Sequence, residues 1–211
     1  MKESEFREKV MPLFGISIFL MAIGSIISTA ISYANENVVI GSYIVYGLIL
    51  LSIFLMKRKR PWNVALFFAF SFATGLIVSP ILFVIFGFRQ VFFSEATLVS
   101  SLFILSLSLY SIVSKKDFRT IGGMIIAINI GLIVASLINI FIVHVLYDLI
   151  VDVVAILLSL AMVLLDMSRI IRDYNDDDYI TAAISIYTDF LKFLWRIITL
   201  GINFFTGLFK K

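Results

Sequence analysis

The sequence predicts an all-α membrane protein, with one domain of seven transmembrane helices over residues 1–211. Of its residues, 61% are hydrophobic and only 15% are charged, and the mean hydropathy is +1.08. Soluble proteins contain about 45–50% apolar residues. The apolar residues also form long runs, each close to the roughly 20 residues with which a helix crosses about 30 Å of hydrocarbon.

Seven apolar runs follow one another, separated by short polar or charged connections. The expected spans cover residues of about 11–34, 38–56, 63–87, 96–114, 120–145, 149–171 and 179–205. The first run is longer than the roughly 7–15 residues of a signal-peptide core, and further runs follow it. We therefore expect it to be retained as the first helix.

Basic residues lie mainly in alternate connections, which predicts the orientation in the membrane. The second, fourth and sixth connections carry Lys57, Arg58, Lys59, Arg60, Lys115, Lys116, Arg119, Arg169 and Arg172. The positive-inside rule then places the amino terminus in the cytoplasm and, after seven spans, Lys210 and Lys211 on the opposite side. The lack of cysteine favours a prokaryotic plasma membrane, with the endoplasmic reticulum or Golgi membrane as alternatives.

Several classes of function are disfavoured by what the sequence lacks. Without cysteine and with His144 as its one histidine, the chain has no thiolate or multi-histidine metal site. Its basic clusters adjoin apolar runs, which indicates contact with lipid headgroups and no nucleic acid. Asp189 lacks the Gly-x-Gly-Asp context of presenilin-type proteases, and motifs of other hydrolases are absent. We expect no catalysis and no cofactor.

Two carboxylates, Asp166 and Asp189, stand inside the sixth and seventh apolar runs. Placing a charge there costs about 2.5–3.5 kcal/mol on insertion scales, so such residues indicate function. Counted from Arg172 and Asp178, they lie roughly 9 and 16 Å inside the cytoplasmic ends of adjacent antiparallel helices. If they meet, desolvation and mutual repulsion favour a shared proton, and the pair senses pH.

An alternative is that Asp189 pairs within its own helix. Lys192 and Arg196 lie about 60° and about 20° from it around the helix axis, so all three share one face. Asp166 would then need another basic partner, either Lys57 or Lys192.

Two other acidic groups have plainer interpretations. Residues 173–178 begin like an EF-hand, but Asp178 replaces the required glycine and Ile184 replaces the bidentate glutamate. We therefore expect a solvated loop with Asp178 as a helix cap.

His144, Asp148 and Asp152 recur every fourth residue. We expect a turn at this position and favour helix capping as their role. A weak cation site at the outer mouth is the alternative.

Small, weakly polar residues occur throughout the third and fourth apolar runs. They are Ser71, Thr74, Gly75, Ser79, Ser100, Ser101, Ser106, Ser108 and Ser111. We favour close helix packing, with the hydroxyls bonded back to carbonyls, and keep a pore lining as the alternative.

Five local patterns, in this order and spacing, resemble the Bax inhibitor-1 family. They are residues 70–81 (FSFATGLIVSPI), 114–118 (SKKDF), 139–141 (NIF), 165–166 (LD) and 179–190 (YITAAISIYTDF). The resemblance covers most of residues 40–195. It implies a bundle of six helices around the seventh and a calcium leak gated by pH.

The same resemblance assigns roles to individual residues. Asp166 and Asp189 match the di-aspartyl pH sensor of prokaryotic members and would make weak contacts with calcium. Lys57 stands where a basic residue pairs with that sensor, although an arginine is more usual. Tyr46 replaces an acidic residue, and Lys192 and Arg196 occupy positions that are more often uncharged.

We therefore expect a pH-sensitive calcium leak channel that interacts with the bilayer, calcium and protons. One alternative is a non-conducting regulator that binds a membrane-protein partner, such as a protease or a cell-death protein. Another is a transporter in which the same carboxylates carry protons.

Overall fold

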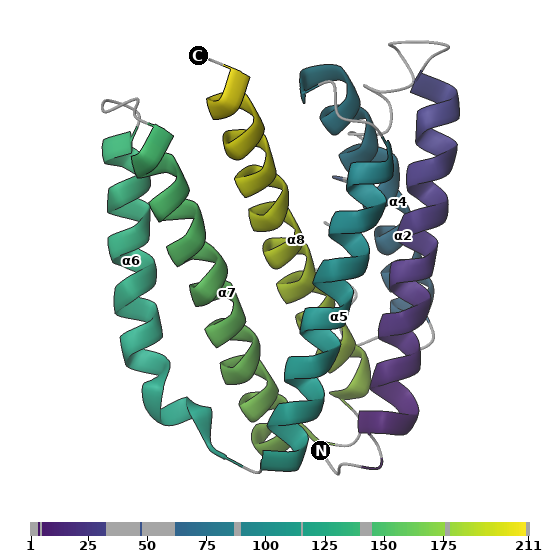
Figure 1. The fold of residues 1–211 in the computed structure, drawn as a ribbon. Helices are drawn as coiled ribbons and strands as arrows, with labels where there is room; N and C mark the ends of the chain where they lie inside the picture. The colour runs from purple at the N-terminus through teal and green to yellow at the C-terminus, as the bar shows by residue number, and fades with distance from the viewer. Residues whose placement is uncertain are drawn as a thin grey trace. The chain divides into compact units, whose positions relative to one another are not determined.

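The computed structural model describes residues 4, 6–32, 47, 62–86, 90–114, 116–139, 145–175 and 178–209. Its α-helices are α2 (Met11–Ser32), α4 (Trp62–Phe86), α5 (Gln90–Ser114), α6 (Gly122–Asn139), α7 (Val145–Asp173) and α8 (Tyr179–Phe209) (Figure 1). A π-helical turn, η1 (Phe6–Val10), precedes α2, and a 3-10 turn, η2 (Phe118–Ile121), precedes α6. The described part of the chain is all-helical, as predicted.

Four helical segments are long and apolar enough to cross a bilayer. Within the described residues these are Glu8–Ser28, Glu95–Ser114, Phe118–Ile138 and Tyr147–Asp173. α4 adds a shorter apolar segment, Trp62–Val78, whereas α8 carries three charged residues within eight positions. The chain is thus a multi-pass membrane protein. The count of seven spans stays a prediction, and the second expected span, 38–56, lies outside the described residues except for residue 47.

The boundary between the fifth and sixth expected spans differs from the prediction. α6 ends at Asn139 and α7 begins at Val145, four residues before the expected start at 149. The residues from Val145 onward are apolar enough to begin the helix early, so Asp148 falls in its first turn. Asp152 therefore lies in the helix interior and is not a cap.

The chain divides into two compact units, which we describe separately. The first, the α2/α4 unit, comprises Lys2–Glu95 and Asn175–Ile184. In it, α2 and α4 pack with their backbones in close approach: a Cβ added at Gly24 would meet the carbonyl of Phe72, and one at Gly75 would meet that of Met21. Small residues permit this approach between membrane helices.

Hydroxyl groups on α4 bond back to their own helix, as the packing interpretation predicts. Ser71 donates to the carbonyl of Phe67 at 2.9 Å, and Thr74 donates to that of Phe70 at 2.8 Å. The side chain of Ser79 lies outside the described residues.

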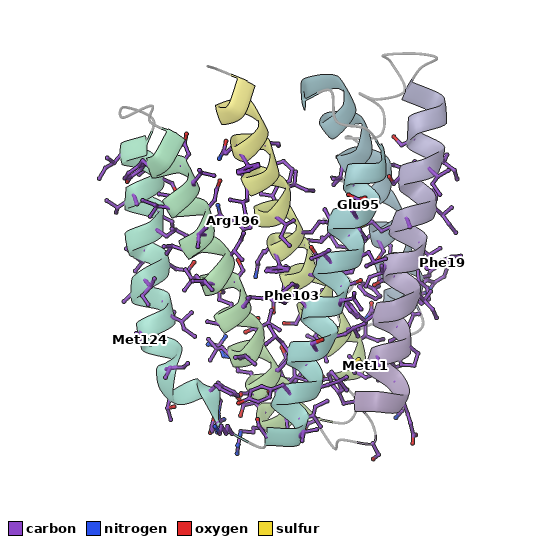
Figure 2. All side chains as sticks on the ribbon, in the orientation of Figure 1. Met11, Phe19, Glu95, Phe103, Met124 and Arg196 are labelled. Atoms are coloured by element: carbon purple, nitrogen blue, oxygen red, sulfur yellow. The ribbon has the colours of Figure 1, made fainter. Side chains whose placement is uncertain are left out.

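The second, the α6/α7 unit, comprises Ala96–Tyr174 and Ser185–Lys211. Its buried apolar cluster joins α6 to α7 and consists of Ile125, Leu132, Ala155, Leu158 and Leu165. Large apolar side chains also point outward, as Met124 does in this unit and Phe19 in the other (Figure 2). An apolar exterior of this kind suits contact with lipid.

Candidate functional site

Asp189 is a buried carboxylate on α8. Asp189 is 3% exposed. The ammonium of Lys192, one turn later on α8, donates a hydrogen bond to Asp189 Oδ1 at 3.0 Å. The Lys192 side chain is half exposed, so its charge lies at the edge of the helix while the carboxylate lies inside. The intrahelical pair that was the alternative interpretation of the sequence is therefore present.

Asp166 on α7 belongs to the same group of charges. Its carboxyl lies near enough to that of Asp189 for the two charges to interact, and it also accepts a hydrogen bond from Arg169 Nη1 at 3.2 Å. The structure thus brings the two aspartates together and gives each a basic neighbour on its own helix. Two neighbouring carboxyls repel each other when both are ionised, so the arrangement suits a shared proton.

The predicted basic partners have different positions. Lys192 contacts Asp189, but no ion pair among the described residues joins Arg196 to it. Arg196 instead lies within electrostatic range of Asp152. The reason is that Arg196 lies about two turns beyond Asp189, or roughly 10 Å along the axis. Lys57 and Tyr46 lie outside the described residues.

Asp152 is a functional candidate for which the sequence interpretation favoured another role, that of a helix cap. It is 4% exposed and accepts a hydrogen bond from Asn203 Nδ2 of α8 at 2.6 Å. A signal was available, because Asp152 and Asp166 are fourteen residues apart, which places them on nearly the same face of α7. His144, its expected neighbour, lies outside the described residues.

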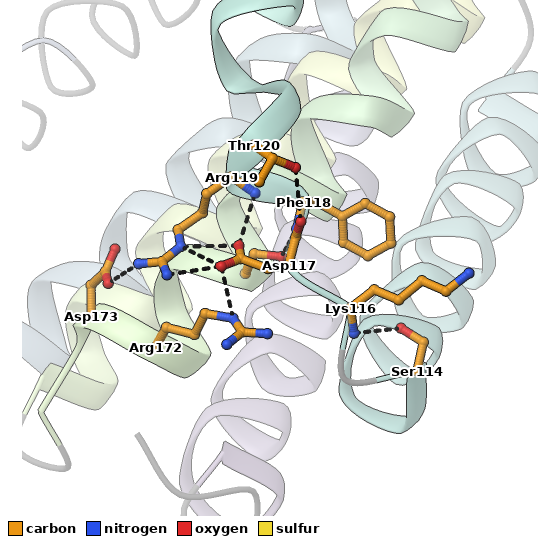
Figure 3. A network of polar contacts seen from close by, with 9 residues as sticks. Ser114, Lys116, Asp117, Phe118, Arg119, Thr120, Arg172 and Asp173 are labelled. Atoms are coloured by element: carbon orange, nitrogen blue, oxygen red, sulfur yellow. Dashed lines mark hydrogen bonds and ion pairs between the residues drawn. The ribbon is translucent and has the colours of Figure 1, made fainter.

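A second charged cluster lies on the connection between α5 and η2 and at the end of α7 (Figure 3). Asp117 accepts from the Arg119 guanidinium at 2.9 Å and from the Arg119 backbone N–H at 3.0 Å, and Arg172 lies 3.6 Å from its Oδ2. Arg119 also pairs with Asp173. Hydrogen bonds from Arg119 lower the pKa of the Asp117 carboxyl from 3.8 to about 2. We call these four residues the charged end of α7.

The acidic loop before α8 shows no metal-binding arrangement in its described part. Asp178 accepts from the backbone N–H of Asn175 at 3.2 Å, and Asp173 pairs with Arg119. Residues 176 and 177 lie outside the described part. Among the described residues, no three His, Cys, Asp or Glu side chains gather as a metal site would require. Calcium contact at Asp166 and Asp189 stays a prediction.

Comparison with known proteins relates most of the chain to one family. The family model described as "Inhibitor of apoptosis-promoting Bax1" matches residues 3–206. An uncharacterized protein of Campylobacter jejuni is 26% identical over 198 residues, which cover 90% of this chain and 84% of that protein. "Modulator of FtsH protease YccA" of Escherichia coli is 27% identical over 177 residues, covering 83% of this chain and 79% of that protein.

Shorter matches agree with these. An uncharacterized membrane protein of Vibrio cholerae is 35% identical over 107 residues, which cover 51% of this chain and 48% of the relative. The relatives described as membrane proteins are bacterial.

Proposed function

Because this multi-pass membrane protein belongs to the Bax inhibitor-1 family, we propose that it is a pH-sensitive calcium leak channel gated by Asp166 and Asp189. The observation that carries the proposal is a buried carboxyl on α8 that lies within electrostatic range of a second carboxyl on α7, each with a basic neighbour on its own helix. Two such groups in apolar helices are costly to keep, and adjacent carboxyls bind protons as a pair.

Protonation would act on the gate by changing the local charge. With both carboxyls ionised, Asp166 and Asp189 balance Arg169 and Lys192. One added proton gives this group of four residues a net positive charge and weakens the ion pair of the aspartate that takes up the proton. A change of one charge at this depth biases the helices between closed and open packings.

Calcium enters this proposal as the transported ion, and no cofactor or catalytic step is involved. A calcium ion takes about six to eight oxygen ligands, which two carboxylates do not supply. Contact with Asp166 and Asp189 would therefore be weak, as conduction requires, since an ion must leave the site it enters.

Hydroxyl groups on α5 support a polar path. Ser100, Ser108 and Ser111 are each at most 2% exposed, and among the described residues their hydroxyls have no hydrogen-bond partner. Buried hydroxyls are normally paired, so water or a passing ion would satisfy them. This favours the pore-lining interpretation for these three residues, whereas Ser101 of α5 and Ser71 and Thr74 of α4 bond back to their own helices.

The proposal retains the remaining expectations from sequence. These are seven spans with six helices around α8, a cytoplasmic amino terminus, Lys57 as a further partner of the pair, and a bacterial plasma membrane. The bacterial relatives support the last of these.

Calcium flux into liposomes tests the function directly. Purified wild-type protein would be compared with Asp166→Asn and Asp189→Asn from pH 6 to pH 8. Asparagine resembles a protonated aspartate in shape and neutrality, so each variant should lose most of the pH dependence and resemble the wild type at low pH. Ser136→Ala, which changes a residue of α6 whose hydroxyl bonds back to the carbonyl of Leu132 on its own helix, serves as a control and should keep the pH profile.

The outcomes separate the candidate functions. Wild-type flux no greater than that of empty liposomes at every pH rejects the channel. Flux whose pH profile survives in both asparagine variants rejects the aspartate gate alone. Saturable, gradient-coupled uptake favours the transporter.

A second function is favoured by one relative. The Escherichia coli protein bears the name of a modulator of a membrane protease, and a non-conducting regulator of such a protease is our alternative. Reconstitution with a membrane-bound protease would then change the rate of substrate degradation while calcium flux stays absent. Unchanged degradation rejects this alternative.

A further inference from the structure

Polar residues on α7 and α8 recur with the same spacing of seven residues. On α7 they are Asp152, Ser159 and Asp166, and on α8 they are Asp189, Arg196 and Asn203. Seven residues are close to two helical turns, so each set forms a nearly straight line along one helix face, with about 10 Å between members.

A hydrogen bond at one end and an electrostatic interaction at the other place the two lines against each other. Asp166 interacts with Asp189, and Asn203 donates to Asp152 at 2.6 Å. The helices are antiparallel, and fourteen residues separate the two contacts on each of them. Ser159 and Arg196 therefore share the middle level. We call these six residues the polar seam; at 1.5 Å per residue it is roughly 21 Å long, against about 30 Å of hydrocarbon.

Arg196 is the one strongly basic member of the polar seam. It lies between α7 and α8 (Figure 2) and within electrostatic range of Asp152. Asp152 is 4% exposed, and a further carboxylate, Asp148, lies near it on α7. Keeping an arginine and an aspartate at this depth is costly, whereas apolar residues of similar size are often at least as stable there. Packing alone does not account for these two charges.

We propose that Arg196 is a positively charged plug in the polar seam, one step along it from the Asp152–Asn203 contact, which limits the passage of cations beyond the Asp166/Asp189 pair. The inference rests on the proposed leak function. A fixed guanidinium repels a divalent cation twice as strongly as a monovalent one, and a low dielectric strengthens that repulsion. Arginine residues form such electrostatic barriers in other pores.

Neutralising the pair tests the plug. The main variant is Asp152→Asn with Arg196→Gln, because removing both charges leaves the net charge of the seam unchanged, whereas either single change alters it by one. Calcium flux in liposomes should rise several-fold in the double variant, and Arg196→Lys should remain near the wild type. Size-exclusion profiles and melting temperatures check folding, and the double variant should melt above either single variant.

A second readout does not depend on calcium flux. The chain has no cysteine, so Ser159→Cys provides a unique thiol at the middle of the seam. A cationic methanethiosulfonate should react with it more slowly than an anionic one, and the double neutral variant should abolish this difference. Leu157→Cys, at a position 61% exposed on the apolar side of α7, should show no such charge preference.

The combined results distinguish the two proposals. Charge-selective labelling without wild-type calcium flux rejects the leak channel but supports Arg196 as a barrier in a seam that serves another ion. The plug is overturned if flux is present and unchanged in the double variant. It is also overturned if Ser159→Cys reacts with neither reagent, or equally with both in the wild-type background.

Discussion

Two ion pairs of the same spacing differ in how deeply their carboxylates are buried. Asp189 with Lys192 and Asp166 with Arg169 each join positions i and i+3. The carboxylate side chain is 3% exposed in the first pair and 18% in the second, while both basic side chains are about half exposed. A carboxylate that is shielded from water depends more on its basic partner for stabilisation than a partly exposed one does.

Lys192→Gln should therefore destabilise the protein by about 1–3 kcal/mol, because it leaves a buried carboxylate without its cation. This loss of stability is smaller than that for a fully buried ion pair, because the lysine side chain is half exposed. Equilibrium unfolding in detergent measures the change. Adding Asp189→Asn should recover much of the loss.

Arg169→Gln is the matched control at the residue scale. The carboxylate that Arg169 pairs with, Asp166, is more exposed than Asp189, so the loss of stability should be smaller than for Lys192→Gln. Equal losses from the two variants would show that burial of the carboxylate does not decide the strength of these pairs.

At the scale of the elements, α2 and α4 depend on two glycines that let their backbones approach. An added Cβ at Gly24 or Gly75 would meet a carbonyl of the other helix, and a backbone atom cannot yield as a flexible side chain does. Gly24→Ala and Gly75→Ala should each destabilise the protein by about 1–3 kcal/mol, despite the better helix propensity of alanine. Thermal unfolding in detergent measures this.

Two other helical glycines serve as controls for that prediction. A Cβ at Gly15 or Gly123 meets nothing within 4 Å. Alanine at either position should stabilise the protein by about 0.5–1 kcal/mol, because glycine is a poor helix former. Stabilisation by Gly24→Ala as well would contradict close packing of α2 against α4.

The sequence predicted the described helices well because each is an apolar run between charged or polar connections. The errors lie at helix ends where no charged or polar connection interrupts the apolar residues. No charge or glycine separates the end of α6 from the start of α7, and the turn was expected too late. This error assigned Asp152 to a cap, although it lies inside α7 and contacts Asn203.

The candidate site was predictable in part for a related reason. Depth along a helix follows from counting residues, so Asp166 and Asp189 were expected in the same half of the membrane, and the two do interact. Which residue Arg196 faces depends on the register between two helices. The spacing of seven on each helix indicates that register only after one cross-helix contact is known.

At the scale of the whole molecule, the distribution of charge predicts how the chain lies in the membrane. The charged end of α7 gathers Arg119 and Arg172 with Asp117 and Asp173 at one end of the α6/α7 unit. Basic residues in short connections favour the cytoplasmic side. This end should therefore face the cytoplasm, and the end with the Asp152–Asn203 contact should face outward.

Labelling of single cysteines in intact cells tests this orientation, since the chain has no cysteine of its own. Lys2→Cys and Lys116→Cys should react with an impermeant maleimide only after the cells are opened. Lys211→Cys should react in intact cells, because an odd number of spans places the two termini on opposite sides. Protection of Lys211→Cys in intact cells, with Lys116→Cys also protected, would contradict seven spans and indicate that α8, with its three charges, does not cross the bilayer.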